Sequence, residues 1–309
     1  MARATIFCLH SVEKHDDPGR LLGAMGISDV FLDRFLRHLK YRGIDVVSLD
    51  ECLARLSSRD LSPFVCITFD DGYRDNYEVA YPILRHHCAP AAIFLATGLL
   101  DRTSPMWWHP LERAISTSAS FGLGQDRRAL ATDADRWQVY THWADRFRGA
   151  NSEEKDQLID DLAKSNPNFL PSDAFETALE WGMVKEMAGS GLITFGAHTA
   201  THPVMAQLTL AELVEEVVTS RDRCADMIGQ DTEYFAYPFG QAHETGRLAP
   251  RIVEQAGFRA AFTTRAVTMK ASTSQNRFQL PRIMVSRRTQ SIEAIDAYLS
   301  GLTEIIKWA

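Results

Sequence analysis

The chain has 309 residues, of which 45% are hydrophobic and 24% charged, the composition of a soluble globular protein. Forty acidic against 33 basic residues give a formal net charge of −7, which argues against a nucleic-acid groove as the main function. The longest apolar stretch, near Ala91–Leu100, is about half of the roughly 20 residues that a bilayer crossing requires, so we expect no integral membrane segment. The N-terminus shows no secretory signal, and we expect a cytoplasmic protein.

Short runs rich in Ile, Val, Phe and Thr alternate with helical patterns along most of the chain. Several of these runs are apolar on both faces, which is typical of buried parallel strands. The expected strands are Thr5–Leu9, Asp45–Leu49, Val65–Phe69, Ala92–Ala96, Ile193–Ala197, Glu233–Tyr237, Ala260–Thr264 and Leu280–Val285. This alternation favours an α/β barrel or a doubly wound sheet.

Helix boundaries are marked by capping residues. Ser28 is expected to cap a helix with one apolar stripe. Thr209 and Glu212 fit a capping box for a helix that runs to about Gly229. A last amphipathic helix is expected over about Ser291–Trp308.

The alternation of strands and helices stops between about residues 100 and 190, where helical patterns follow one another without a convincing strand. We expect this segment to be a helical insertion on the barrel that forms a lid or rim. The alternative is a solvated helical hairpin with only a packing role.

The first chemical signal is an apolar strand that ends in two carboxylates, Asp70 and Asp71, followed by Gly72. Neighbouring side chains on a strand point to opposite faces, so the two carboxylates are expected to do different work. One can ligate a metal while the other faces substrate or water. The alternative is a polar strand end whose Asp caps a helix that begins near Arg74.

The second signal is a pair of histidines, His198 and His202, directly after an expected strand. Histidines four residues apart can face one ion from a helical turn, although Pro203 favours a short turn over a long helix. Together with one carboxylate of the Asp pair they make a three-ligand site with open positions. That arrangement is typical of a hydrolytic metal centre.

These residues share a position in the expected fold. His10, the Asp pair, His198 and the segment Tyr237–Gly240 each lie at the C-terminal end of an expected strand. In α/β barrels this face carries catalysis, so we expect these residues to meet there.

Five blocks of residues now make the sequence recognisable. Thr68–Gly72, His198–His202 and Phe235–Gly240 resemble the three motifs of the polysaccharide deacetylases, the NodB-homology family also called carbohydrate esterase family 4. Leu9–Val12 and Leu280–Ile283 are similar to a branch of that family that carries a histidine on its first strand.

The resemblance covers roughly residues 1–100 and 187–290 and leaves out the helical segment. It implies an α/β fold, a distorted (β/α) barrel of the polysaccharide deacetylase type. We therefore expect a single NodB-homology domain over residues 1–309, with the helical insertion at about 100–190.

The resemblance also implies a metal-dependent hydrolase that removes an N-acyl group, usually acetyl, from an amino sugar. Matched by position, Asp70 is the general base, and Asp71, His198 and His202 are the metal ligands. The backbone N–H of Phe239 would hold the oxyanion. Zn²⁺ is the expected metal, with Co²⁺ and Ni²⁺ as alternatives.

The sequence departs from the family pattern in two places. Ala236 stands where the common third motif has an Arg held against the catalytic Asp, and no histidine follows His243 to supply the acid of a late Leu-x-His motif. We expect His10 to act as the acid, the alternative being a histidine packed at the barrel rim. We expect Arg282 to orient Asp70, the alternative being a structural salt bridge.

Aromatic residues mark the expected substrate side of the site. Trp107 and Trp108 can form a platform for a sugar ring, or they can be the buried anchor of the insertion. Tyr237 and Phe239, from the third motif, are expected beside the substrate or its oxyanion.

If the protein is cytoplasmic, as expected, its substrate is expected to be a soluble or lipid-linked precursor and not a cell-wall polymer. A free, nucleotide-linked or lipid-linked amino sugar, or a short oligosaccharide, is the expected carbohydrate partner. The alternatives are a deformylase or amidase acting on another N-acyl or imide substrate, and an inactive barrel that only binds glycan. The intact Asp70 argues against the inactive barrel. No pattern indicates the oligomeric state.

Overall fold

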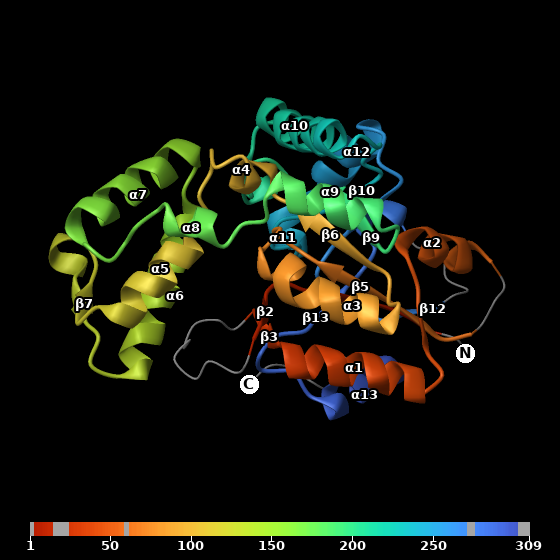
Figure 1. Cartoon of the computed structure of the whole chain (residues 1–309). Helices are drawn as coiled ribbons and strands as arrows, with labels where there is room; N and C mark the ends of the chain where they lie inside the picture. The colour runs from red at the N-terminus through yellow and green to blue at the C-terminus, as the bar shows by residue number, and fades with distance from the viewer. Residues whose placement is uncertain (1–2, 15–24, 59–61, 271–275, 302–309) are drawn as a thin grey trace.

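The centre of the computed structural model is a nine-stranded sheet that curls into a half-barrel (Figure 1). The structure describes residues 3–14, 25–58, 62–270 and 276–301. Neighbouring strands run in the order β11–β10–β9–β6–β5–β1–β12, and each pair except β1–β12 is parallel. The strands are β1 (Arg3–Leu9), β5 (Phe64–Phe69), β6 (Ala91–Leu95), β9 (Ile193–Ala197), β10 (Tyr234–Ala236), β11 (Ala260–Phe262) and β12 (Met269–Lys270), with β4 (Asp45–Val46) beside β5 and β13 (Ile283–Met284) beside β1.

The segment 280–285 closes the gap between the two ends of the curled sheet. Leu280 pairs with Phe262 of β11, and β13 pairs with β1. The sequence predicted one strand over this whole segment, but only β13 is regular, because Pro281 has no backbone N–H for a ladder. The distorted (β/α) barrel predicted from the sequence is thus confirmed.

Helices surround the sheet, and most of them cover its outer face, whereas α2 (Leu49–Ser57) packs against the barrel interior (Figure 1). The other helices around the sheet are α1 (Asp29–Tyr41), α3 (Tyr81–His87), α4 (Thr97–Leu100), α9 (Trp181–Gly189), α10 (Leu210–Ile228), α11 (Ala242–Thr245), α12 (Ala249–Gln255) and α13 (Ile292–Ser300). A π-helical turn over Asn76–Ala80 precedes α3, and β2 (Val12–Glu13) pairs with β3 (Ile27–Ser28). Among the described residues, none of the helices combines the length and apolar character that a bilayer crossing requires.

The predicted helix caps are confirmed. The Ser28 hydroxyl accepts a hydrogen bond from the N–H of Phe31 (3.1 Å), and the capping box of Thr209 and Glu212 begins α10. The strand predicted over Asp45–Leu49 is shorter than expected, because Ser48 caps α2 instead of extending β4. The part of the last predicted helix beyond residue 301 lies outside the described residues.

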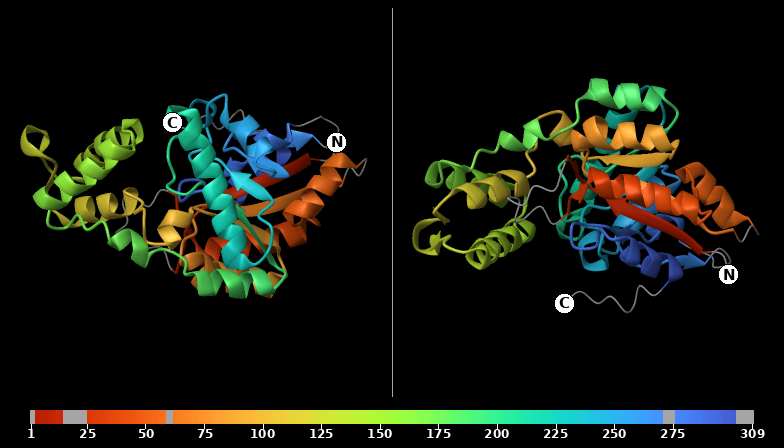
Figure 2. Two further views of the ribbon diagram at one scale, coloured as in Figure 1. Left: turned by 90° about the horizontal axis from the view of Figure 1, so that it is seen from above. Right: turned by 60° about the horizontal axis from the view of Figure 1, so that its bottom comes forward.

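The segment between β6 and β9 projects from one side of the sheet (Figure 2). It contains α5 (Trp108–Thr117), α6 (Asp133–Gly149), α7 (Ser152–Ser165) and α8 (Asp173–Glu176). A small hydrophobic core of its own, which includes Trp143 and Phe147, holds α5, α6 and α7 together, whereas α8 packs against the main core. The expectation of no strand here is wrong, since β7 (Ser120–Phe121) and β8 (Arg128–Ala129) form a hairpin. Strands of two residues carry no periodicity that a sequence pattern can reveal.

Alternation along the strands directs polar residues into the barrel. In β5, Phe64 and Cys66 belong to the interior cluster, whereas the odd-numbered residues pack under the outer helices. The period of two therefore directs Asp70, which follows β5, inward. The same count on β1 directs Cys8 and His10 inward, so these three side chains converge at one end of the barrel.

Candidate active site and metal centre

The Asp70 carboxylate is bound by a guanidinium inside the barrel. Nη1 of Arg282 donates to Oδ1 (2.7 Å) and Nη2 donates to Oδ2 (2.6 Å), a bidentate pair between two side chains that are almost fully buried. Arg282 also donates to the Thr68 hydroxyl (3.0 Å) and the Thr263 carbonyl (3.1 Å). The Cys8 thiol donates to Oδ2 of Asp70 (3.3 Å). The whole carboxylate is therefore held in one orientation.

The charges around Asp70 keep it ionised. Burial alone would raise the pKa of this carboxyl, but the Arg282 guanidinium and the nearby His198 hold its pKa below the usual value. An ionised carboxylate in a fixed orientation is the state that a general base requires.

Three further side chains, each able to bind a metal, meet beside Asp70. Nε2 of His198 and Nε2 of His202 lie 3.4 and 3.3 Å from Oδ1 of Asp71, and all three side chains are buried. One ligand atom from each residue lies within 4.8 Å of the other two. Burial would raise the pKa of Asp71, but the two imidazoles lower it well below its usual value. The predicted ligands are thus brought together around one point.

This cluster fits a divalent cation. His198 Nδ1 donates a hydrogen bond to the carbonyl of Ala236 (2.7 Å), and Nε2 is left to face Asp71. Metal-binding histidines usually make such a hydrogen bond with the ring nitrogen that does not bind the metal. Within the described residues, Oδ1 of Asp71 and Nδ1 of His202 are buried without a hydrogen-bond partner. Two imidazole nitrogens and a carboxylate oxygen are typical zinc ligands, and an ion would satisfy the carboxylate oxygen.

Strained backbone surrounds the site. Asp71 (φ 75°), Thr199 (φ 64°), His202 (φ 55°) and Phe239 (φ 60°) adopt the left-handed conformation although none is glycine. Only six non-glycine residues do so in the described parts of the chain. Such residues cost energy and persist where the surrounding structure enforces them, often at functional sites. The strain turns Asp71 away from the outward direction that strand alternation predicts.

A carboxylate on α10 holds the loop between the two histidines. Glu216 accepts hydrogen bonds from the N–H groups of Ala200 (2.8 Å) and Thr201 (2.9 Å) and from the Thr201 hydroxyl (2.6 Å). The sequence analysis missed Glu216, because nothing in its helix distinguishes it from the neighbouring Glu215. The loop is irregular and not helical, in agreement with the short turn that Pro203 was expected to favour over a helix.

His10 lies at the end of β1, half-buried beside Asp70. Its ligand atom, the Cys8 sulfur and an Asp70 oxygen lie within 4.8 Å of one another. Arg282 occupies both oxygens of Asp70, so a second cation there would face a guanidinium. Burial lowers the pKa of His10, and its buried Nδ1 has no hydrogen-bond partner within the described residues.

Two aromatic rings form a wall over His202. The rings of Trp108 and Phe239 lie 4.8 Å from the His202 ring, measured between centroids. Trp108 Nε1 donates to the hydroxyl of Tyr73 (3.0 Å). Both wall residues are half-buried and so lie between the buried ligands and solvent.

The other two predicted aromatic residues pack in hydrophobic cores. Trp107 is buried and stacks on Phe147 of the inserted segment at 4.9 Å, so its geometry is that of the buried anchor. Tyr237 is fully buried, and its hydroxyl donates to the Phe278 carbonyl (2.8 Å). Neither side chain lines the metal cluster.

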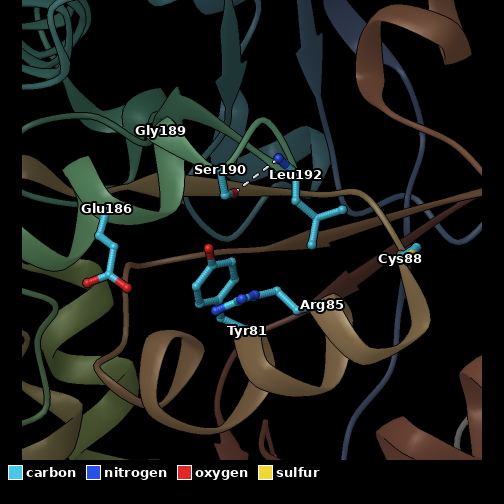
Figure 3. A pocket seen from close by; sticks show the side chains of 7 residues that line it. All are labelled: Tyr81, Arg85, Cys88, Glu186, Gly189, Ser190 and Leu192. Atoms are coloured by element: carbon cyan, nitrogen blue, oxygen red, sulfur yellow. Dashed lines mark hydrogen bonds between the residues drawn. The ribbon is translucent and has the colours of Figure 1, made fainter.

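Two hollows lie at the opposite, N-terminal edge of the sheet. The larger, about 530 Å³, lies between α3 and α9 and is lined by Tyr81, Arg85, Cys88, Glu186, Gly189, Ser190 and Leu192 (Figure 3). The other, about 300 Å³, lies near the starts of β9 and β10. Neither hollow is lined by a candidate metal ligand.

Comparison with known sequences identifies the family. Residues 58–261 match the family described as polysaccharide deacetylase. The chain belongs to the polysaccharide deacetylase family. The match contains the Asp pair and both histidines, whereas His10 and Arg282 lie outside it.

Individual relatives match the chain at low sequence identity. The Bacillus subtilis (strain 168) protein named "Putative polysaccharide deacetylase YxkH" is 24% identical over 238 residues, 77% of this chain and 57% of that protein. The chain thus spans less than two thirds of that relative. The Streptococcus pyogenes deacetylase PplD in complex with acetate superposes with a TM-score of 0.65 at 20% identity, covering 96% of this chain and 98% of PplD. IcaB from Ammonifex degensii has a TM-score of 0.63 at 18% identity, covering 97% and 98%.

We expect Glu216→Gln to weaken divalent-metal binding about 10- to 100-fold, because residues that orient metal ligands contribute on this scale. A chelator-competition titration with Zn²⁺ measures the change. The matched control is Glu215→Gln, an exposed neighbour on the same helix, which should bind like the wild type. Equal affinity of both variants and wild type would contradict a role for Glu216.

Proposed function

We propose that the chain is a metal-dependent hydrolase that removes an N-acyl group, most simply N-acetyl, from an amino sugar. Membership of the polysaccharide deacetylase family supports the reaction class, hydrolysis of a linear amide on a carbohydrate. The observation that carries the proposal is the position of a fixed, ionised Asp70 directly beside the donor cluster of Asp71, His198 and His202.

The donor cluster would hold the metal. Asp71, His198 and His202 supply one carboxylate and two imidazoles, which suit Zn²⁺ and also accommodate Co²⁺ or Ni²⁺. When bound, such a cation supplies Lewis acidity that polarises an amide carbonyl and acidifies water.

Asp70 would act as the general base. Its contacts with Arg282 keep it ionised and oriented, so it can accept the proton of a water that attacks the amide carbon. Arg282 thereby acts as a positioning residue in place of the Arg that the third motif lacks.

Two further groups would complete the reaction. The N–H of Phe239 makes no hydrogen bond to the described part of the chain and can donate to the developing oxyanion. His10, on the other side of Asp70, would give a proton to the departing amine. The rings of Trp108 and Phe239 would border the sugar.

The substrate and its acyl group are part of the proposal. A free, nucleotide-linked or lipid-linked amino sugar remains our expectation, with a formyl group or another amide as the alternative chemistry. The cytoplasmic location stays a prediction that cell fractionation would test. A barrel that only binds glycan is disfavoured by the oriented, ionised Asp70, which binding alone does not require.

We expect Asp70→Asn to reduce acetate release from N-acetylated chito-oligosaccharides by at least about 100-fold, the usual contribution of a general base. Bound metal, measured by elemental analysis, should stay at the wild-type level. The control His198→Ala/His202→Ala should lose the metal. Formate is measured in parallel to detect a deformylase. Full turnover by Asp70→Asn, or a wild type that binds no metal after incubation with zinc, would contradict the proposal.

For Arg282→Lys we expect kcat to fall about 10- to 100-fold with KM little changed, because a single ammonium cannot bind both oxygens of Asp70. Arg282→Met should also lose about 3–5 kcal/mol of unfolding free energy, since it leaves Asp70 buried and unpaired. Adding Asp70→Asn should restore much of that stability. A wild-type kcat in Arg282→Lys would show that the ion pair between Arg282 and Asp70 is only a structural salt bridge.

If His10 is the acid, His10→Gln should slow amide hydrolysis about 100-fold or more while hydrolysing p-nitrophenyl acetate near the wild-type rate. The reason is that p-nitrophenolate leaves without a proton, whereas an amine does not. Equal losses on both substrates would show that His10 only packs at the barrel rim.

A further inference from the structure

Helix α6 of the inserted segment contacts the barrel near the site at both of its ends. At its start, the Trp137 ring lies under the guanidinium of Arg288 (5.1 Å), which follows β13. At its end, the carbonyl of Arg148 accepts a hydrogen bond from Gln207 (2.9 Å), which follows the histidine loop. These two contacts fix which face of α6 is turned toward the barrel.

The Arg148 side chain lies on that face, close to the candidate metal ligands. Its guanidinium carbon is 5.6 Å from the centre of the Phe239 ring. The same ring packs edge-on to the His202 ring at 4.8 Å. A single aromatic ring therefore separates a cation from a candidate metal ligand.

The Arg148 guanidinium is available to a ligand. Its side chain is 48% exposed, and within the described residues its ion pair is with Asp145 at 3.7 Å, one helical turn away. An exposed pair of this kind contributes little. Placement over an aromatic ring orients the guanidinium while its planar N–H donors stay free for a bidentate contact.

We propose that Arg148 binds an anionic group, a phosphate or a carboxylate, carried by the substrate next to its N-acyl amino sugar. This inference rests on the proposed function and narrows its substrate class to anionic N-acyl sugars. It also gives the inserted segment a role as the rim of the site. Guanidinium geometry matches either anion, because both present two oxygens in one plane.

The kinetic test compares three substrates with the intact chain. N-acetylglucosamine 1-phosphate carries the phosphate, N-acetylmuramic acid carries the carboxylate, and di-N-acetylchitobiose is neutral. We expect Arg148→Gln to lower kcat/KM for the preferred anionic sugar about 10- to 100-fold, mainly through KM, and to change the neutral sugar less than about threefold. A rise in ionic strength should weaken the wild-type preference.

The matched control lies on the other face of the same helix. Arg146 is also exposed, lies over the Trp143 ring at 4.5 Å and pairs with Asp126 at 3.1 Å. Arg146→Gln should leave the kinetics of all three substrates unchanged. Equal losses on anionic and neutral sugars in Arg148→Gln, or no wild-type preference for either anionic sugar, would overturn the inference.

A binding measurement separates this inference from the proposed function. Calorimetry with the Asp70→Asn variant measures affinity for the same three sugars without turnover. Tighter binding of an anionic sugar that is lost on adding Arg148→Gln supports the inference even if no acetate is ever released, an outcome that would overturn only the proposed function. Equal binding of all three sugars overturns the role of Arg148.

Discussion

The buried ion pair between Arg282 and Asp70 is the interaction on which the site depends. Removing two charges from water costs several kcal/mol for each ion, and the attraction between them offsets this only when the geometry is good. Here both carboxylate oxygens are bound, and further guanidinium donors reach the Thr68 hydroxyl and the Thr263 carbonyl. Because Arg282 lies on the segment that closes the sheet, barrel closure and orientation of the Asp70 carboxylate are one structural event.

Around this pair, the strands determine where the site residues lie, and the loops determine their backbone conformations. The parallel strands bring Asp70 and the histidine loop to the same end of the barrel through their shared direction. The loops then hold Asp71 and His202 in left-handed conformations, which the Glu216 carboxylate and the neighbouring packing enforce. Strain of this kind is stable only in a rigid frame. The buried strands supply that frame.

The strands and the motif residues could be predicted from the sequence, whereas several side-chain contacts at the site could not. Buried strands are nearly continuous apolar runs, so all eight expected strands have counterparts, and family motifs pointed to the candidate ligands. Other features depend on tertiary contact alone. Glu216 looks like its neighbour Glu215 until the fold places it under the histidine loop. Trp107 and Trp108 are adjacent in sequence, yet one packs in a core and the other lies over His202.

The pairing of Asp70 with Arg282 joins residues that are 212 positions apart in the chain. Contacts between such distant residues are slow to form, because the loop between them must first lose its conformational entropy. During synthesis the candidate metal ligands all leave the ribosome well before Arg282 does. A nascent chain can therefore assemble the candidate ligands early, while Asp70 stays unoriented until the closing segment is made. The Asp70 carboxylate thus gains its bidentate partner only after the closing segment has been made.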